Sequence, residues 1–372
     1  MRTKLVSDIR NRIGMPSLSA NYATLYINNE YLGLFIFTDL FKESWIEYVY
    51  GEKDTQLLYK CTNCFIDFKY RAGFENENKE VTNKKELYEF LAEMTKAKSV
   101  SDIESIFDID QFYKEIAVDV LVSSWDHLMH NYYIYKNKNN NKWIYLSHDF
   151  DLDMGTFGNG PTYRLNDLYK STTINKFVSI KDPRFRKIMK EIVSKVFNPA
   201  TLFPHIDEIK SFIRPYVELE KTPDEKGNYP GRLNKSDLSF FTLKQWEDSI
   251  EFKNFKDIYA LKKFILLKYR IICYEYELDC DPVYLDRHYG RTNNTIDNSN
   301  KEESNNKNEQ IKIDPENENE IENETTSTLI ENKTTTPTSI SEDDNAINVD
   351  VDVDEDTTED SSSETDDTDE NN

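Results

Sequence analysis

The sequence lacks several features that would assign it to common functional classes. It has no uninterrupted apolar run of about 18 residues, so we expect no membrane-spanning helix. The N-terminal stretch MRTKLVSDIRNRIG predicts a charged amphipathic helix and contains no apolar core of a secretory signal. No strongly basic patch is visible, which argues against a nucleic-acid partner. Glycine is scarce, at 10 residues in 372, and no glycine-rich phosphate-binding loop is visible.

The negative charge of the chain is concentrated at its C-terminal end. The net charge is −23, but residues 291–372 contain 26 acidic and 5 basic residues, whereas residues 1–290 contain 43 and 41. A segment this rich in Asn, Asp, Glu, Ser and Thr cannot bury enough apolar surface to offset its ordering entropy. We therefore expect a folded domain over residues 1–288 and a disordered acidic tail over residues 289–372. A sharper hypothesis makes the tail a kinase substrate, since acidic surroundings are common around phosphoacceptors.

Cysteine is also scarce. The four cysteines occur as two local pairs, Cys61 with Cys64 in CTNC and Cys273 with Cys280 in CYEYELDC. Two disulfides in an exported protein fit this spacing about as well as four reduced thiols in a cytosolic one. A structural zinc site is a weaker alternative, because the second spacing is wider than in the usual zinc motifs.

Hydrophobic periodicity predicts a mixed α+β chain. The pattern indicates a small N-terminal β-sheet, a central hairpin and a larger helical C-terminal part. Strands are expected over 22–27, 31–37 and 57–70 and on both sides of the KNKNNN tract at 136–141. Helices are expected near the N-terminus, before Gly14, within 39–50, and over 85–96, 109–129, 184–196, 207–220, 242–252 and 255–276.

The central segment Ser123–Gly155 carries most of the candidate chemistry, including three of the five histidines and four aspartates. The expected helix delivers Asp126, and Asn131 follows in a D-x-x-x-x-N spacing. A hairpin comes next and leads directly into Asp149-Phe150-Asp151. This is the order in which protein kinases present the catalytic Asp, a metal-binding Asn and a metal-binding Asp. The hairpin is a rigid spacer that should bring acids distant in the sequence to one end.

The segment WDHLMHNYYIYKNKNNNKWIYLSHDFDLDMGTFG resembles the core of the spore-coat-protein-H (CotH) kinase family. The family's core has an acid, then HN with aromatic and aliphatic residues, a Trp-containing strand, and D-x-D near an aromatic-Gly. Upstream, IRNRIGMPS, YATLYINNEYLGLFIF and LLYK appear in the family's order and spacing. The resemblance covers roughly residues 1 to 280, and the central motif is its specific part.

The resemblance implies an atypical protein kinase-like fold that uses ATP with Mg²⁺ or Mn²⁺. It also implies transfer of phosphate to Ser or Thr of secreted, surface or coat proteins, and hence an extracellular or cell-surface location. By position, Asp126 would be the catalytic acid/base. Asn131 and Asp149 would bind the metal and nucleotide, and Asp151 would be a further acid at the same metal-phosphate site.

The sequence departs from the family in two respects. Asp39 stands where the family usually has Glu, and family members usually start well before this Met1, so we expect the first strands to be missing. A surface adhesin or pseudokinase that keeps the kinase-like shell is therefore an alternative. Lys60, in LLYK, is either a phosphate contact or, as we favour, a solvated strand-end lysine.

A metal-dependent hydrolase is a second alternative. It would use His127, His130 and His148 with the nearby aspartates, and His130 and His148 flank the hairpin on sites that could face each other. We favour the simpler interpretation that the histidines orient the loop acids by hydrogen bonds.

Overall fold

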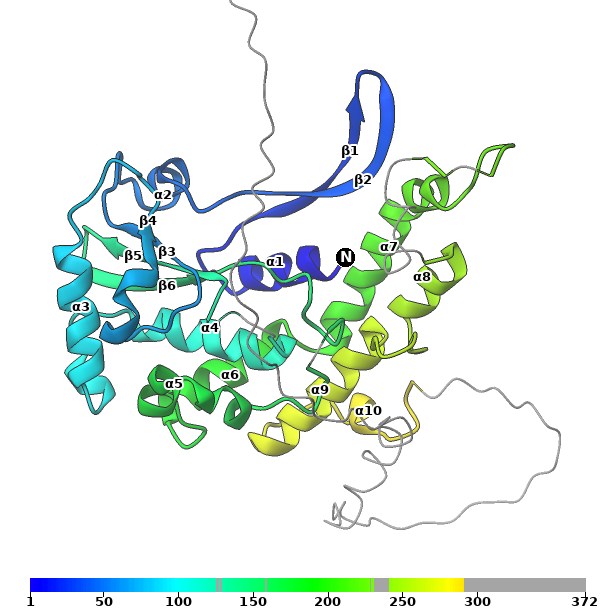
Figure 1. The fold of residues 1–372 in the computed structure, drawn as a ribbon. Coiled ribbons are helices and arrows are strands. Elements are labelled where there is room, and N and C mark those ends of the chain that lie inside the picture. Colours follow the sequence, from blue (N-terminus) through cyan, green and yellow to red (C-terminus); the bar gives the residue numbers. More distant parts are fainter. Residues whose placement is uncertain (125–126, 128, 158, 228, 231–240, 291–372) are drawn as a thin grey trace, which may run out of the picture. The chain divides into compact units, whose positions relative to one another are not determined.

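The computed structural model describes residues 1–290 apart from positions 125–126, 128, 158, 228 and 231–240. Helices and strands are mixed along the chain (Figure 1), which confirms the expected α+β class. The strands are β1 (Ala20–Ile27), β2 (Glu30–Thr38), β3 (Leu58–Cys61), β4 (Phe74–Asn76), β5 (Tyr132–Asn137) and β6 (Lys142–Ser147). The longer helices are α1 (Arg2–Arg12), α2 (Glu43–Tyr50), α3 (Lys85–Lys96), α4 (Ile109–Val122), α6 (Pro183–Lys195), α7 (Pro199–Glu220), α8 (Leu243–Ile250) and α9 (Leu261–Glu275).

The described residues also contain the short helices α5 (Thr172–Phe177) and α10 (Pro282–Leu285), with 3₁₀ turns at Phe68–Gly73, Val100–Asp102 and Leu165–Lys170. None of the described helices combines the length and apolarity needed to cross a membrane. Residues 291–372 lie outside the described part of the chain, so the disorder of the tail stays a prediction.

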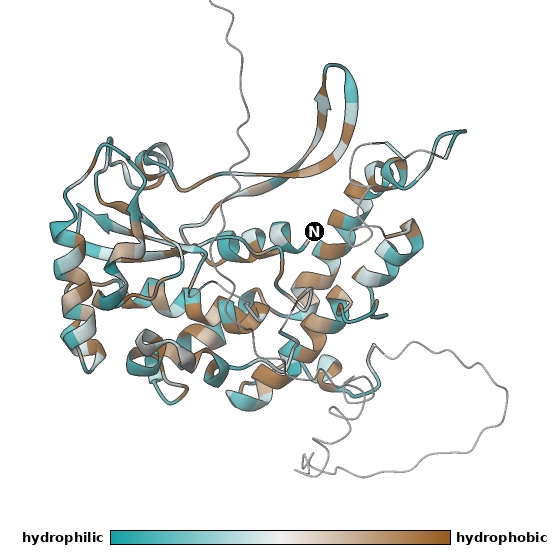
Figure 2. Cartoon of the chain, viewed as in Figure 1, coloured by the Kyte–Doolittle hydropathy of each residue, from teal (hydrophilic) through white to brown (hydrophobic). Residues whose placement is uncertain are grey.

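The hairpin β1–β2 forms where the sequence predicts it. Asn28 and Asn29 make its two-residue turn, with φ angles of 51° and 64°. Asparagine visits this left-handed conformation more readily than most residues, and such turns match the twist of the strands. Strand β1 contacts α1 and strand β2 contacts α7. Figure 2 shows hydrophobic segments along the strands and a hydrophilic turn.

A four-stranded antiparallel sheet, in the order β4-β3-β5-β6, forms the second sheet. Alternate side chains of each strand divide between its two faces. Tyr132 and Tyr145 pack into the main core with α4. Tyr133 and Leu146 pack on the other face, in a smaller core around Trp45 of α2. Because both faces are covered, β5 and β6 are nearly continuous runs of buried residues rather than alternating ones.

Helix α4 is shorter than the sequence indicates. It begins at the predicted residue, and Asp108 caps it by accepting a hydrogen bond from a first-turn N–H. We expected it to reach Met129, but it ends at Val122 because Ser123 adopts φ 55° and ψ 55°. The N–H groups of the two residues that follow then bond to carbonyls of the last helical turn, which closes the helix. The described residues between Val122 and β5, which are 123–124, 127 and 129–131, are therefore not helical.

Three other boundaries differ from the prediction. Residues 57–70 are a strand only over β3, because the chain turns back after it at the Cys61–Cys64 disulfide. Helix α7 begins before residue 207, at a proline preceded by the capping side chain of Asn198. Helix α9 begins after residue 255, because Phe255 and Ile258 form an isolated antiparallel bridge instead.

Candidate active site

One end of the β5–β6 hairpin gathers predicted site residues. The ladder continues one step beyond the strands, since the His148 N–H donates to the Asn131 carbonyl at 3.0 Å. Asn131 therefore lies across from His148, and Asp149 is the next residue. The Asp149 and Asp151 side chains are exposed, and Asn131 is half-buried. Asp126, the predicted catalytic acid/base, lies outside the described residues.

A buried histidine ties this end of the hairpin to helix α4. His127 Nδ1 lies 2.7 Å from Asp119 Oδ1, and His127 Nε2 lies 2.8 Å from the backbone carbonyl oxygen of Asp149. Asp153 Oδ2 lies 3.4 Å from the same Nε2. The side chains of His127, Asp119 and Asp153 are at most 2% exposed. We call His127, Asp119 and the Asp149 carbonyl the His127 clamp.

The two carboxylates make His127 a cation. Burial alone lowers the pKa of His127, but Asp153 and Asp119 outweigh burial and raise this pKa to about 10. Both ring nitrogens of the imidazolium therefore donate hydrogen bonds, and neither has a lone pair for a metal ion. The contacts of both ring nitrogens with protein oxygens argue against the hydrolase alternative, because that alternative needs His127 as a metal ligand. The expectation that the histidines orient the loop by hydrogen bonds is confirmed for His127.

His148 has a different environment. Its ring centroid lies 5.3 Å from that of Tyr133. Burial, together with nearby positive charges of which His127 is the strongest, lowers the pKa of His148 to about 4, so this ring is neutral. Across the ladder His148 pairs with Asn131 rather than with His130, contrary to the pairing that the hydrolase alternative suggested.

Helix α4 carries a buried polar stripe at four-residue spacing, formed by Gln111, Glu115 and Asp119. Glu115 accepts two hydrogen bonds from Arg10 of α1, at 2.5 Å for Nη1–Oε2 and 2.8 Å for Nη2–Oε1. Arg10 Nη1 also donates to Ser147 Oγ at 3.0 Å. The stripe therefore joins α1 and β6 to the helix that holds His127. Sequence reasoning missed it, although acids within an otherwise apolar helix were a usable signal.

Phe150 packs between these two networks. Its ring lies edge-on to the His127 ring, with centroids 4.6 Å apart. The Arg10 guanidinium lies over the same ring, 5.1 Å from its centroid. Phe150 is 7% exposed, so the residue between the two exposed acids anchors their turn in the core.

The turn that follows β6 uses left-handed backbone at several positions. Asp149, Met154 and Gly155 have φ angles of 69°, 53° and 75°. The Met154 N–H donates to the carbonyl of Val122 at 2.7 Å, which joins the turn to the end of α4. A Cβ at Gly155 would lie 2.8 Å from the Tyr259 Cβ, so both the space and the φ angle require glycine here.

Lys60 is exposed at the end of β3. It pairs with Tyr133 across the ladder, which places it on the same face of the sheet as His148. Lys60 makes no ion pair with any described side chain. Asp39, which replaces the family's usual Glu, is exposed after β2 and likewise has no ion pair within the described ranges.

Both cysteine pairs are disulfides, Cys61–Cys64 and Cys273–Cys280. The free-thiol and zinc alternatives are therefore wrong. The Cys64 N–H donates to the Met129 carbonyl at 3.0 Å, so the first disulfide also supports the loop before β5. Over the described positions, no group of three or more His, Cys, Asp or Glu side chains could hold a metal ion. The predicted magnesium ligands include the amide of Asn131, which is not one of these four residue types. The magnesium site therefore stays a prediction.

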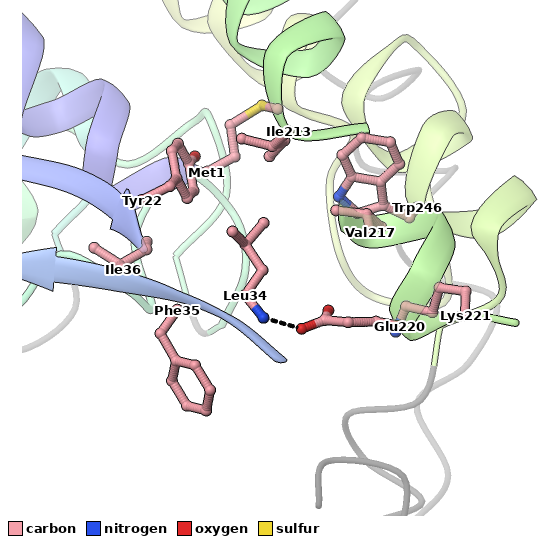
Figure 3. A pocket seen from close by; sticks show the side chains of 10 residues that line it. All are labelled: Met1, Tyr22, Leu34, Phe35, Ile36, Ile213, Val217, Glu220, Lys221 and Trp246. Carbon is pink, nitrogen blue, oxygen red and sulfur yellow. Dashed lines mark hydrogen bonds between the residues drawn. The ribbon is translucent and has the colours of Figure 1, made fainter. Parts of the chain in front are cut away.

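A cavity of about 190 Å³ is lined by none of the predicted site residues (Figure 3). It lies between β2 and helices α7 and α8, and its lining includes Ile213, Val217 and Trp246. At one side Glu220 accepts a hydrogen bond from the Leu34 N–H. The cavity is smaller than the roughly 300–1,000 Å³ of typical ligand pockets, so we assign no nucleotide to it.

Comparison with known proteins identifies the family. A model of the CotH kinase protein family matches residues 1–255, well over half of the chain. The chain belongs to the CotH kinase protein family. The matched CotH region includes the hairpin end, the His127 clamp and the polar stripe of α4, and the resemblance seen in the sequence is confirmed.

Three CotH-type proteins of Rhizopus delemar are similar to this chain. Invasin CotH3 is 28% identical over 261 residues, which are 60% of this chain and 43% of that protein. Spore coat protein homolog 1 is 25% identical over 261 residues, covering 63% and 42%. Invasin CotH2 is 25% identical over 265 residues, covering 60% and 43%. The chain thus spans less than half the length of these curated relatives.

Proposed function

We propose that this chain is a protein kinase of atypical kinase-like fold, which transfers phosphate from ATP to Ser or Thr of secreted or surface proteins. The observation that carries the proposal is the end of the β5–β6 hairpin. There the ladder pairs Asn131 with His148, the residue directly before Asp149, within a segment that the CotH kinase family model matches. The sequence order of a metal-binding Asn, a hairpin and a metal-binding Asp is the order found in protein kinases.

The donor chemistry at this end fits a divalent cation. Asp149 and Asp151 expose carboxylates two residues apart, and Asn131 offers an amide oxygen. Mg²⁺ prefers hard oxygen ligands and usually takes one or two carboxylates together with substrate phosphates. Asn131, Asp149 and Asp151 would hold Mg²⁺ or Mn²⁺, and the bound cation would neutralise charge on the ATP phosphates.

The remaining work belongs to the chain's own residues. Asp126 would accept the proton of the Ser or Thr hydroxyl, which makes the acceptor a better nucleophile. Lys60 is exposed on the same face of the sheet as His148, and a phosphate contact is its alternative to the solvated position that the sequence favours. Phosphoryl transfer needs little covalent chemistry from the protein, so holding the acceptor and the phosphates in line is the main contribution.

An extracellular or cell-surface location belongs to the same proposal. Two disulfides suit an oxidising compartment. The names of the Rhizopus relatives, invasin and spore coat protein homolog, also support a surface or coat location and protein partners there.

The second candidate is a surface adhesin or pseudokinase that keeps the fold without catalysis. The invasin names of two relatives favour it, as does the exposed Asp39, which has no described lysine as an ion-pair partner. Exposed apolar side chains along the β1–β2 hairpin, such as Tyr26 at 58% and Phe37 at 70% exposure, would suit binding to another protein.

The decisive experiment is a nucleotide-dependent thermal shift. ATP with Mg²⁺ should raise the melting temperature of the wild-type chain, and Asp149→Ala should abolish the shift. Asp54→Ala is a matched control, because Asp54 is an exposed aspartate with φ 53° in the loop before β3. If ATP and Mg²⁺ together leave the wild-type melting temperature unchanged, the kinase proposal is wrong and the adhesin candidate gains.

Turnover is tested separately by transfer of labelled phosphate to an acidic Ser/Thr peptide and to the chain itself. Asp126→Asn should keep nucleotide binding and lose transfer. Nucleotide binding without transfer by the wild type would support the pseudokinase. Loss of binding in Asp126→Asn would instead indicate that Asp126 binds the metal.

A further inference from the structure

We propose that His127 is a positioning residue, which sets the turn from Asp149 to Asp153 so that the Asp149 and Asp151 carboxylates can bind the metal. The inference rests on the proposed nucleotide function. It concerns how the chain holds its metal-binding acids in place before any ligand arrives.

The first observation is that both ends of the turn meet one nitrogen. The backbone carbonyl of Asp149 lies 2.8 Å from His127 Nε2, and Asp153 Oδ2 lies 3.4 Å from the same atom. Asp151, between these two contacts, is exposed. His127 therefore closes a short loop around its Nε2–H and leaves the acid in the middle pointing to solvent.

The second observation is that the turn needs such a constraint. Asp149 has φ 69°, a left-handed conformation that costs free energy for residues other than glycine, although less for aspartate and asparagine than for most. Such backbone persists where its surroundings over-determine it. The hydrogen bond from His127 to the Asp149 carbonyl oxygen fixes this peptide directly.

The third observation is that His127 is itself fixed. Asp119, fully buried on helix α4, accepts from Nδ1–H at 2.7 Å. Phe150 packs edge-on against the ring. The rigid helix thus sets the imidazolium, and the imidazolium sets the turn. A carboxylate held in advance loses less conformational entropy when it binds a cation.

Two isosteric replacements separate positioning from simple packing. The amide nitrogen of glutamine can take the place of Nε2, whereas that of asparagine can take the place of Nδ1. His127→Gln should keep the donor to the Asp149 carbonyl, and His127→Asn should keep only the donor to Asp119. Both variants remove the same positive charge from the same buried site, so each is the control for the other.

We expect magnesium-ATP affinity, measured by titration, to fall by less than about threefold in His127→Gln and by at least about tenfold in His127→Asn. Without ligand, amide hydrogen exchange over residues 150–154 should be faster in His127→Asn than in His127→Gln. Equal losses of affinity and equal exchange in the two variants would overturn the positioning role and leave His127 a packing residue.

A measurement on the wild-type chain covers the case in which a variant does not fold. The Nε2–H resonance of His127 should be visible by NMR and should shift when Mg²⁺ and a non-hydrolysable ATP analogue are added. His205, whose Nε2 lies 2.8 Å from Asp8 Oδ2 in a separate hydrogen bond, is the control and should not shift. An unmoved His127 resonance in a chain that binds the analogue would refute the inference. A chain that does not bind it refutes the kinase proposal, while the exchange comparison still decides whether His127 holds the turn.

Discussion

Replacing Arg10 should lower the free energy of unfolding more than replacing any exposed charged residue does. Arg10 and Glu115 are 1% and 0% exposed, and they form a two-point ion pair between α1 and α4. Arg10→Met keeps most of the apolar stem but leaves the Glu115 carboxylate buried without a cation. Breaking one partner of a buried pair typically costs about 3–5 kcal/mol. At about 2 °C per kcal/mol for a large domain, the melting temperature should fall by roughly 6–10 °C.

A double-mutant cycle separates the pair from its surroundings. Arg10→Met with Glu115→Leu removes both charges, so no ion is left unpaired. We expect the double variant to lose less stability than the two single losses added together, by about 2 kcal/mol or more. The matched control is the exposed pair Lys79–Glu75, at 78% and 66% exposure, where Lys79→Met should cost about 0.5 kcal/mol or less.

The assay is urea unfolding of the untagged chain, followed by circular dichroism and tryptophan fluorescence. Coincident transitions and an unchanged denaturant slope are required before the free energies are compared. A loss below about 1 kcal/mol for Arg10→Met would contradict the burial of the pair. Additive single losses would show that Arg10 and Glu115 act independently, despite their bidentate contact.

Three further predictions concern pH and backbone. The pKa of His127 is raised to about 10 in the folded chain from 6.5 in the unfolded chain, so protonation of His127 stabilises the fold fully below pH 6.5. In metal-free urea titrations, the free energy of unfolding of wild type should exceed that of His127→Gln by an amount that shrinks as pH rises toward 10. Burial lowers the pKa of Lys268 from 10.5 to about 7, so the stability of wild type relative to Lys268→Met should increase as pH rises from 7 to 10.5. A stability difference that does not change with pH would contradict the lowered pKa. Gly155 has φ 75° and a close neighbour, so in thermal unfolding Gly155→Ala should lower the free energy of unfolding by about 2–4 kcal/mol. Gly51 has φ 72° and nothing within 4 Å, so Gly51→Ala should lower it by about 1 kcal/mol. Equal losses would contradict a steric clash of the added methyl group at position 155.

Local sequence signals were reliable where the local chain decides the structure. The two-residue turn at Asn28 and Asn29 follows from backbone preference, and α3 spans the predicted residues because its apolar positions repeat at helical spacing. The end of α4 could not be predicted in the same way. Apolar residues continue after Val122, and only the left-handed backbone of Ser123 with its closing hydrogen bonds stops the helix.

In the candidate site, too, some features follow from the local sequence and others depend on the tertiary surroundings. Part of the arrangement was predictable, because an antiparallel hairpin brings the residue before its first strand, Asn131, across from the residue after its second strand, His148. Asp149 comes one residue later in the chain. The roles of the histidines were only partly predictable from their positions in the sequence. His127 and His148 lie close to the same hairpin end, yet the pKa of one is raised to about 10 and that of the other is lowered to about 4. The difference comes from carboxylates beside one ring and from burial near positive charge for the other.

The polar stripe of α4 shows how the missed contacts could have been inferred. Glu115 and Asp119 lie four residues apart inside a helix whose other positions are almost all buried. A buried carboxylate is tolerated only when it is paired and hydrogen-bonded, so each acid requires a cation or several donors from elsewhere in the chain. One partner, Arg10, is 105 residues away from Glu115, and the other, His127, is 8 residues from Asp119. The sequence therefore implied that two partners exist, but only the tertiary fold could identify them. Since both partners also contact Phe150, the fold couples helix packing to the turn that carries the proposed metal ligands.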